Sequence, residues 1–166
     1  MKYRLRSINT MKLLKEKSHF LLGPRQTGKT QLIRNELGGI PQFNLLDSDT
    51  FLALAQRPAR LREELSKEAK FAVIDEIQKL PSLLDEVQLL IEERGTHFLL
   101  TGSSARKLRS GGVNLLGGRA RSRYLHPFAW PEIDRGTFDL IKHLDFGALP
   151  SIHTSANSRA DLAAYV

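Results

Sequence analysis

The residues that most clearly indicate chemistry form one octapeptide near the start of the chain. Residues 23–30 read Gly-Pro-Arg-Gln-Thr-Gly-Lys-Thr, which satisfies the pattern G-x-x-x-x-G-K-[ST] at each fixed position. A glycine-rich turn before a helix points backbone N–H groups at one volume, and the helix N-terminus adds about half a positive charge. Lys29 adds a full charge for the β- and γ-phosphates, and the Thr30 hydroxyl is a hard ligand for Mg²⁺. The octapeptide therefore predicts a phosphate-binding loop for a nucleoside triphosphate.

The flanks of this octapeptide strengthen the prediction. An apolar run at 19–22 leads into it, and a helix-like stretch with Leu32, Ile33 and Leu37 leads out. A surface turn that carries Lys-Thr by chance is the alternative, and the strand–turn–helix setting disfavours it. The residues expected to contact the nucleotide are Gly23, Pro24, Arg25, Gln26, Thr27, Gly28, Lys29, Thr30 and Gln31.

Two acids, Asp75 and Glu76, close an apolar run that begins at Phe71. The carboxyl ends of parallel strands open onto the ligand crevice, and strand alternation points neighbouring side chains to opposite sides. Asp75 is therefore expected to hold the Mg²⁺ shell together with Thr30, and Glu76 to orient and deprotonate an attacking water. The alternative is an acidic cap on the following helix, which the phosphate loop upstream disfavours.

A third polar motif, Thr-Gly-Ser-Ser at 101–104, closes another apolar run. In P-loop enzymes with an extra strand between the phosphate-loop strand and the acidic strand, this strand end lies beside the γ-phosphate. Ser103 would then donate a hydrogen bond to that phosphate or to the attacking water. Ser103 or Ser104 as the N-cap of a helix at 105–108 is an equal alternative, and both roles can hold at once.

Periodicity predicts an alternation of strands and helices along the chain. A short helix at 7–17, with Ser7 as its cap, precedes the first strand. We expect strands at 18–22, 42–46, 71–75, 97–101 and 121–125, and helices at 30–37, within 47–65, and at 81–94. This pattern predicts an α/β, three-layer P-loop fold. Similarity to the P-loop enzymes with an extra strand implies a five-stranded, mainly parallel sheet of order 5-1-4-3-2, in which the 97–101 strand lies between the phosphate-loop and acidic strands.

Composition bounds the classes of protein and partner. The 166 residues contain no cysteine, which suits a reducing cytosol and excludes thiolate metal sites, and no apolar run approaches a membrane span. Lys plus Arg is 25 against 18 for Asp plus Glu, a net charge of +7 that favours polyanionic partners. Much of this excess lies at 106–123. A solvated basic face near the nucleotide and a nucleic-acid contact surface are both open, and the lack of interleaved aromatic residues disfavours the second.

The motifs together resemble a known family. The phosphate loop, then Val-Ile-Asp-Glu-Ile-Gln-Lys-Leu-Pro at 73–81, Leu-Thr-Gly-Ser-Ser-Ala-Arg-Lys-Leu at 100–108 and Leu-Leu-Gly-Gly-Arg-Ala at 115–120 occur in that order. They are similar to prokaryotic AAA-like P-loop ATPases that carry a C-terminal domain of unknown function, and the resemblance runs from about Tyr3 to Pro150. It implies ATP and Mg²⁺, with Asp75 at the metal, Glu76 and Lys29 in catalysis and Ser103 as a polar sensor. It also makes Arg119 a candidate γ-phosphate contact and the segment around Tyr3 and Arg4 a candidate adenine contact.

The end of the sequence gives an expectation about domains. We expect a P-loop ATPase domain at 1–145, and at 146–166 a linker and the start of a truncated C-terminal region. The helix-like pattern at 158–166 has no stop signal, and Leu162, Tyr165 and Val166 form an apolar stripe without a partner. A missing domain or a homo-oligomer would cover it, and slow hydrolysis by these residues alone is expected.

The function favoured at this stage is Mg²⁺-dependent ATP hydrolysis that drives a conformational switch. A small-molecule kinase is the first alternative, although such an enzyme excludes water rather than activating it, and the adjacent Asp75 and Glu76 therefore disfavour it. A nucleotide-gated nucleic-acid-binding module that uses residues 106–123 is the second, and salt-dependent DNA affinity would distinguish it. The guanine-reading motif Asn-Lys-x-Asp is absent from the sequence, which favours ATP over GTP.

Overall fold

The computed structural model describes residues 3–103, 108, 116–133 and 138–165, and a parallel sheet lies at its centre. The strands are Ser18–Leu22 (β1), Gln42–Asn44 (β2), Phe71–Asp75 (β3), His97–Gly102 (β4) and Ala120–Tyr124 (β5). Their order is β2-β3-β4-β1-β5, and each neighbouring pair is parallel. Read from the β5 edge, this is the order 5-1-4-3-2, so the predicted α/β fold is confirmed.

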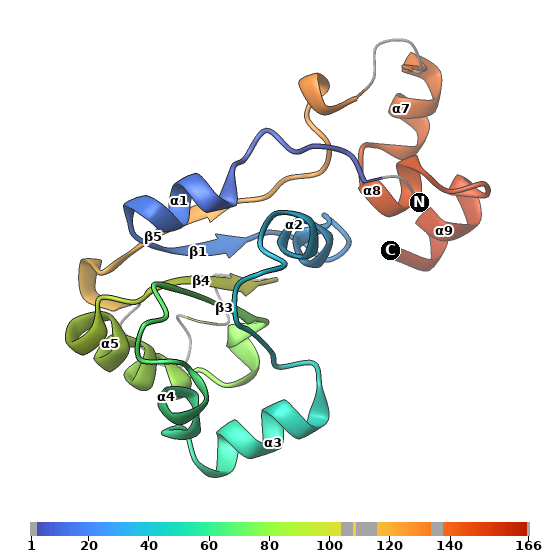
Figure 1. The fold of residues 1–166 in the computed structure, drawn as a ribbon. Coiled ribbons are helices and arrows are strands. Elements are labelled where there is room, and N and C mark those ends of the chain that lie inside the picture. Colours follow the sequence, from blue (N-terminus) through green and yellow to red (C-terminus); the bar gives the residue numbers. More distant parts are fainter. Residues whose placement is uncertain (1–2, 104–107, 109–115, 134–137, 166) are drawn as a thin grey trace.

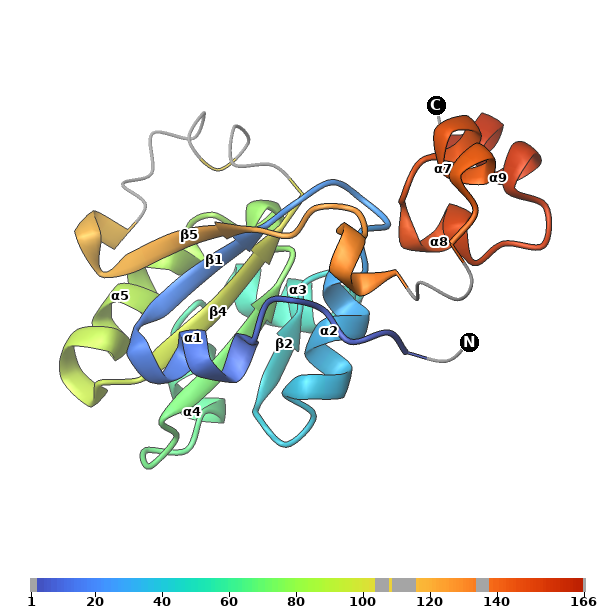
Figure 2. The same ribbon diagram turned by 90° about the horizontal axis from the view of Figure 1, so that it is seen from above.

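Helices cover both faces of the sheet (Figures 1 and 2). Phe20 and Leu22 of β1 pack in one buried cluster with residues of the helices that lie between β2 and β4 in the chain, whereas Leu21 packs in a second cluster with residues of the helices just before and just after β1. The alternation follows from the period of two along a strand. The helices are Thr10–Glu16 (α1), Lys29–Glu36 (α2), Ser48–Gln56 (α3), Arg60–Glu64 (α4) and Leu83–Arg94 (α5).

Burial on both sides explains the apolar strands. All five residues of β1 are buried, and so are four of the five residues of β3. Parallel strands that lie between two helical layers read as continuous apolar runs, which is why the sequence located these two strands to the residue. β2 ends at Asn44 rather than at 46, β4 extends to Gly102, and β5 begins one residue earlier than predicted.

Caps set the ends of the helices. The cap of α1 is Asn9, whose side chain accepts from the Lys12 N–H at 2.8 Å, so the prediction of Ser7 as the cap is wrong. Ser7 instead donates its backbone N–H to Glu132 at 2.6 Å. Asp47 caps α3 through the Thr50 N–H, and Gly95 ends α5 with a positive φ of 64°. Each cap satisfies backbone groups that a helix end leaves unpaired.

The C-terminal helices form a separate group beyond α2 (Figure 1). They are Leu140–Phe146 (α7), Pro150–His153 (α8) and Ser158–Tyr165 (α9), and three short 3₁₀ turns complete the described elements: Ile77–Lys79 (η1), Leu116–Gly118 (η2) and Trp130–Glu132 (η3). Helix α7 runs through the predicted boundary at residue 145, and the division of the chain into two domains stays a prediction.

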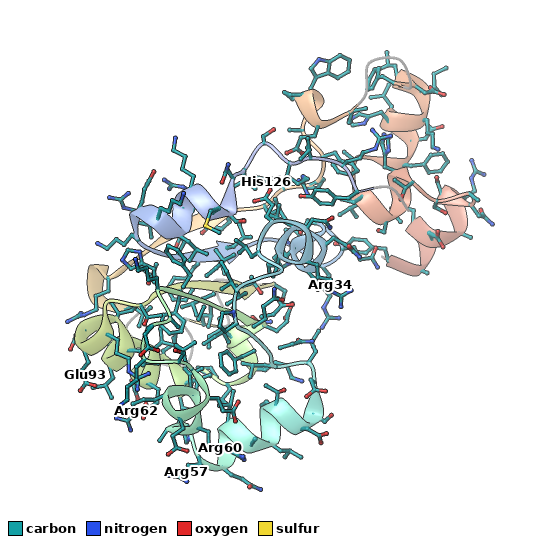
Figure 3. All side chains as sticks on the ribbon, in the orientation of Figure 1. Arg34, Arg57, Arg60, Arg62, Glu93 and His126 are labelled. Atoms are coloured by element: carbon teal, nitrogen blue, oxygen red, sulfur yellow. The ribbon has the colours of Figure 1, made fainter. Side chains whose placement is uncertain are left out.

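Much surface charge is internally paired. Arg57, Arg60 and Arg62 lie around α4, far from the C-terminal helices (Figure 3), and they form ion pairs with Glu63, Glu64 and Glu86.

Within the described part of the chain, no helix has both the length and the apolar character needed to cross a membrane.

Candidate active site

Three loops meet at the carboxyl ends of β1, β3 and β4. The backbone N–H of Gly23, which follows β1, donates to the carbonyl of Gly102 at the end of β4 at 3.2 Å. The N–H of Glu76, which follows β3, donates to the Thr101 hydroxyl at 3.1 Å. The central strands thus bring the three polar motifs of the sequence to one edge of the sheet, where parallel α/β proteins bind ligands.

Backbone geometry explains both glycines of the phosphate loop. Gly28 caps α2 with φ 89°, a left-handed conformation that favours glycine. Gly23 lies so close to the Leu125 carbonyl that an added Cβ would overlap it. Gln26, between them, has φ 63° without being glycine. Such strained residues concentrate where a loop shape serves a ligand.

Lys29 lies folded over the loop that precedes it. Its Nζ donates to the carbonyl oxygens of Gly23 at 2.7 Å and Pro24 at 2.9 Å, and the residue is 6% exposed. Burial lowers the pKa of this ammonium, while the carboxylates of Glu76 and Asp75 act in the opposite direction. The ammonium charge is therefore held inside the loop by two neutral carbonyl oxygens. The oxygen atoms of an anionic ligand can take their place and form stronger hydrogen bonds, because both partners are then charged.

Arg6 supports the phosphate loop from outside. Its guanidinium donates to the carbonyl of Thr27 at 2.7 Å and to that of His126 at 2.7 Å, and it pairs with Glu132 at 3.0 Å. Both charged side chains are 5% exposed. Burial alone would raise the pKa of Glu132, but N–H donors from Ser7 and Ala129 and the Arg6 charge lower it below its ordinary value. Nothing in the local sequence around either residue indicates this ion pair.

Asp75 lies beside two hydroxyl groups. The Thr30 hydroxyl donates to its Oδ2 at 3.1 Å, and the Thr101 hydroxyl donates to its Oδ1. The predicted metal ligands, Thr30 and Asp75, are therefore adjacent although 45 positions separate them in the chain. Their oxygen atoms form the kind of donor set that a hard divalent cation prefers.

Glu76 and Ser103 are joined by a residue that sequence reasoning missed. The Gln78 amide Nε2 donates to the Glu76 carboxylate and, at 3.3 Å, to the Ser103 hydroxyl. Glu76 itself has φ 62°, which turns the chain sharply after β3. The Gln78 Oε1 is buried against Gly102 and has no hydrogen-bond partner among the described atoms. The signal available in the sequence was the position of Gln78, an amide side chain two residues after the Asp75–Glu76 pair.

Two cavities adjoin the phosphate loop. The first, of about 470 Å³, is lined by Arg25, Gln26, Gly28, Lys29, Thr30, Gln31, Leu46, Glu76, Pro150 and Ser151. The second, of about 280 Å³, is lined by Tyr3, Arg4, Arg6, Gly28, Gln31, Asn35, Phe128, Pro150 and Thr154. Six of the nine predicted nucleotide contacts line the first cavity together with Glu76. Gly23, Pro24 and Thr27 shape the loop beneath it, since Gly23 and Pro24 accept from Lys29 and the Thr27 hydroxyl donates to Pro24.

A comparison with protein families agrees with this geometry. Residues 15–134 match the model of a family described as AAA domain. The chain belongs to the AAA domain family. A comparison with curated proteins gives no match. The AAA match spans the phosphate loop, the acid pair and β4, so this part of the chain is an AAA-like P-loop ATPase module.

One predicted catalytic residue lies elsewhere in the AAA module. Arg119 precedes β5, and the neighbouring Ala120 is paired with Ser18, at the start of β1. The phosphate loop follows the other end of β1, after Leu22. Arg119 instead pairs with Glu92 of α5 at 2.5 Å. Within one chain, Arg119 and the phosphate loop therefore lie at opposite ends of the sheet, and the catalytic role of Arg119 stays a prediction.

The basic stretch at 106–123 is described only in part. Arg106, Lys107 and Arg109 lie outside the described residues. Arg121 pairs with Glu16 at 3.5 Å, and Arg123 is exposed. The suggestion that this stretch contacts nucleic acid stays a prediction.

Proposed function

We propose that the AAA module binds ATP with Mg²⁺ and hydrolyses it. The observation that carries this proposal is the meeting of Lys29, Thr30, Gln31 and Glu76 around one cavity, with Asp75 hydrogen-bonded to Thr30 behind it. Lys29 would exchange its two backbone acceptors for the β- and γ-phosphate oxygens. The N–H groups at the start of α2 would bind the same phosphates.

Thr30 and Asp75 are the residues that would hold the metal ion. Their oxygen atoms already lie 3.1 Å apart at the mouth of the loop, and they fit a hard cation. Bound Mg²⁺ would neutralise charge on the phosphate oxygens. Asp75 is fixed for this role by the second hydroxyl, that of Thr101.

Glu76 is the base in this proposal. It would accept a proton from water as the water oxygen bonds to the γ-phosphorus, while the bond from that phosphorus to the β–γ bridging oxygen breaks to give ADP and phosphate. Ser103 and Gln78 would hold the carboxylate and the water in line. Two observations favour this assignment over a helix cap. The Glu76 side chain makes no cap hydrogen bond to the η1 turn, and its backbone is left-handed, whereas N-cap residues are usually extended.

The second cavity is the proposed site of the adenine ring. Tyr3 and Phe128 supply aromatic surface there, and Arg4 lies 5.9 Å from the centre of the Phe128 ring. The shared lining residues Gly28 and Gln31 connect this cavity to the phosphate cavity. Aromatic rings and a planar guanidinium group suit a base that is recognised by stacking rather than by a fixed motif.

A conformational switch is the last part of the proposal. The α8 residue Ser151 donates to Gln26 in the strained part of the phosphate loop at 2.6 Å, and Pro150 lines both cavities. A change in loop shape on nucleotide binding would therefore alter the contact with α8.

Calorimetric titration with ATP and GTP, each with and without Mg²⁺, tests the proposal directly. We expect saturable binding that is tighter for ATP and that strengthens when Mg²⁺ is present. The Lys29→Ala variant supplies the matched control. Equal, weak heats for both nucleotides in the wild type would contradict the proposal.

A further inference from the structure

A third cavity lies next to the proposed base site but outside the phosphate site. It measures about 320 Å³ and is lined by Arg4, Asp139, Lys142, His143, His153 and Thr154. It shares Arg4 and Thr154 with the base cavity and no lining residue with the phosphate-loop cavity. We call it the α7–α8 cavity, because its other lining residues lie on or just before α7, or on α8.

Basic groups dominate this lining. Arg4 and Lys142 carry fixed positive charges, and His143 and His153 can each accept a further proton. The lining carboxylate, Asp139, accepts from the backbone N–H of Lys142 at 3.0 Å as the cap of α7. At neutral pH the fixed charges therefore leave the cavity positive.

The two imidazoles are held in place yet lack polar partners. His153 packs edge-on against Phe128 with ring centres 5.7 Å apart, and His143 lies 5.7 Å from Phe138. The Nδ1 atom of each is buried without a hydrogen-bond partner among the described atoms. Buried polar atoms normally find partners, so two orphaned nitrogens beside two cations indicate a ligand that both can bind.

The charge of the lining selects the class of ligand. Arg4 and Lys142 would repel a cation, and among the described residues no group of three His, Cys, Asp or Glu side chains could hold a metal ion. A phosphate group has several oxygen acceptors and a double negative charge, which suit donors that approach from different sides. We propose that the α7–α8 cavity binds the phosphate group of a small molecule, or free phosphate, through Arg4, Lys142 and the two histidines.

Proton linkage follows from the same contacts. Burial lowers the pKa of His153, and the charges of Arg4, Lys142 and His143 lower it further. A bound anion opposes these three charges, so it raises the pKa of His153 and draws a proton into the cavity. Sulfate keeps its charge between about pH 6 and 8, so its affinity should rise as the pH falls through that range.

NMR of the imidazole rings tests the site with inorganic phosphate, glycerol phosphate and sulfate as probes. We expect saturable shifts of His143 and His153 in the wild type and in Lys29→Ala, which weakens phosphate binding at the loop. Lys142→Gln should weaken the affinity about tenfold or more. Lys67→Gln removes the same charge from an exposed loop and should leave it unchanged.

The probes also identify the source of the phosphate. Tighter binding of glycerol phosphate would assign the site to a phosphate ester, and equal or tighter binding of inorganic phosphate would assign it to the free ion. Ring shifts that do not saturate with any probe would overturn the proposal. Equal affinities of the wild type and Lys142→Gln would overturn it as well, and neither result bears on ATP binding at the phosphate loop.

Discussion

The two ends of the parallel sheet are built in opposite ways. At the carboxyl end, Gln26 and Glu76 adopt left-handed backbone conformations and the Lys29 ammonium is buried. At the amino end, Arg119 is partly exposed and Arg121 is exposed, and both pair with carboxylates of neighbouring helices. The same strands run between both ends, so the difference does not come from the sheet.

This difference separates residues that serve a ligand from residues that serve the fold. Backbone strain and desolvated charge reduce stability, and they persist where the surrounding structure imposes them. Exposed ion pairs contribute little to the free energy of unfolding, so their residues tolerate replacement. Substitutions at the carboxyl end should therefore change activity strongly, and substitutions at the amino end should change it weakly.

The largest effect is expected at Glu76. Glu76→Gln keeps the shape of the side chain but cannot take the proton from water, so turnover should fall about 10²–10⁴-fold while ATP affinity is retained. Steady-state hydrolysis and calorimetry measure the two quantities. Glu93→Gln, an exposed control on α5 (Figure 3), should match the wild type. Wild-type turnover in Glu76→Gln would make Glu76 a structural residue.

Lys29→Ala should weaken Mg-ATP binding by about 1.5–3 kcal/mol, the range for a hydrogen bond to a charged group. Without nucleotide, the Lys29 ammonium already donates hydrogen bonds to two carbonyl oxygens. Part of its interaction with phosphate therefore replaces these existing bonds. Calorimetry gives the difference directly, with the exposed Lys12→Ala as control. Unchanged affinity would remove the phosphate loop from the proposed site.

Gln78→Ala should produce a smaller loss, about tenfold in turnover, with the KM for ATP nearly unchanged. Gln78 does not line the phosphate-loop cavity itself, and its amide contacts the lining residue Glu76 and Ser103. Its removal should therefore disorder the base without removing a nucleotide contact. Gln88→Ala on α5 is the matched control. A rise in KM with turnover intact would show that Gln78 supports binding instead.

A modest effect of pH on stability is expected from His19. This ring is buried in β1, its Nδ1 bonds the Lys17 carbonyl, and burial lowers its pKa. As the pH falls below about 6.5, the unfolded chain takes up a proton that the folded chain excludes, so the free energy of unfolding decreases. Urea denaturation of wild type and His19→Gln between about pH 7 and 5 measures this, and the variant should show the flatter curve. The exposed His126→Gln should keep the wild-type slope.

The smallest effect is expected at Arg119. Arg119→Ala breaks an exposed ion pair with Glu92, which should cost less than about 1 kcal/mol and leave single-turnover hydrolysis unchanged. A large loss of turnover in a dilute, monomeric sample would show that the two ends of the sheet are not functionally separate.

Most of the fold could be predicted from local patterns in the sequence. The strands at 18–22 and 71–75 were predictable because parallel strands buried on both faces leave uninterrupted apolar runs. The order of the sheet was predictable through the resemblance to P-loop enzymes with an extra strand. Ser7 is not the cap because α1 begins at Thr10 and Asn9 caps it, while the Ser7 N–H bonds Glu132, 125 positions away. The structure was needed to locate Arg119, which precedes a parallel strand and lies at the end of the sheet away from the phosphate loop.

The candidate site divides in the same way. Lys29, Thr30, Asp75 and Glu76 were predictable because each belongs to a motif whose spacing carries chemistry. Arg6, Phe128 and Pro150 reach the site from distant parts of the chain, and nothing in their local sequence indicates it. Contacts of this kind, between residues far apart in the chain, can be identified only from the structure.

The Arg6–Glu132 pair has a consequence for how this sequence can vary over evolution. Loss of either partner would strand a buried charge, which typically costs about 3–5 kcal/mol, whereas joint replacement by packed apolar residues can be neutral. Related sequences should therefore exchange positions 6 and 132 together, although 126 positions separate them in the chain. Because Arg6 also holds the carbonyl of Thr27, relatives that have lost the pair should carry a second support for the phosphate loop.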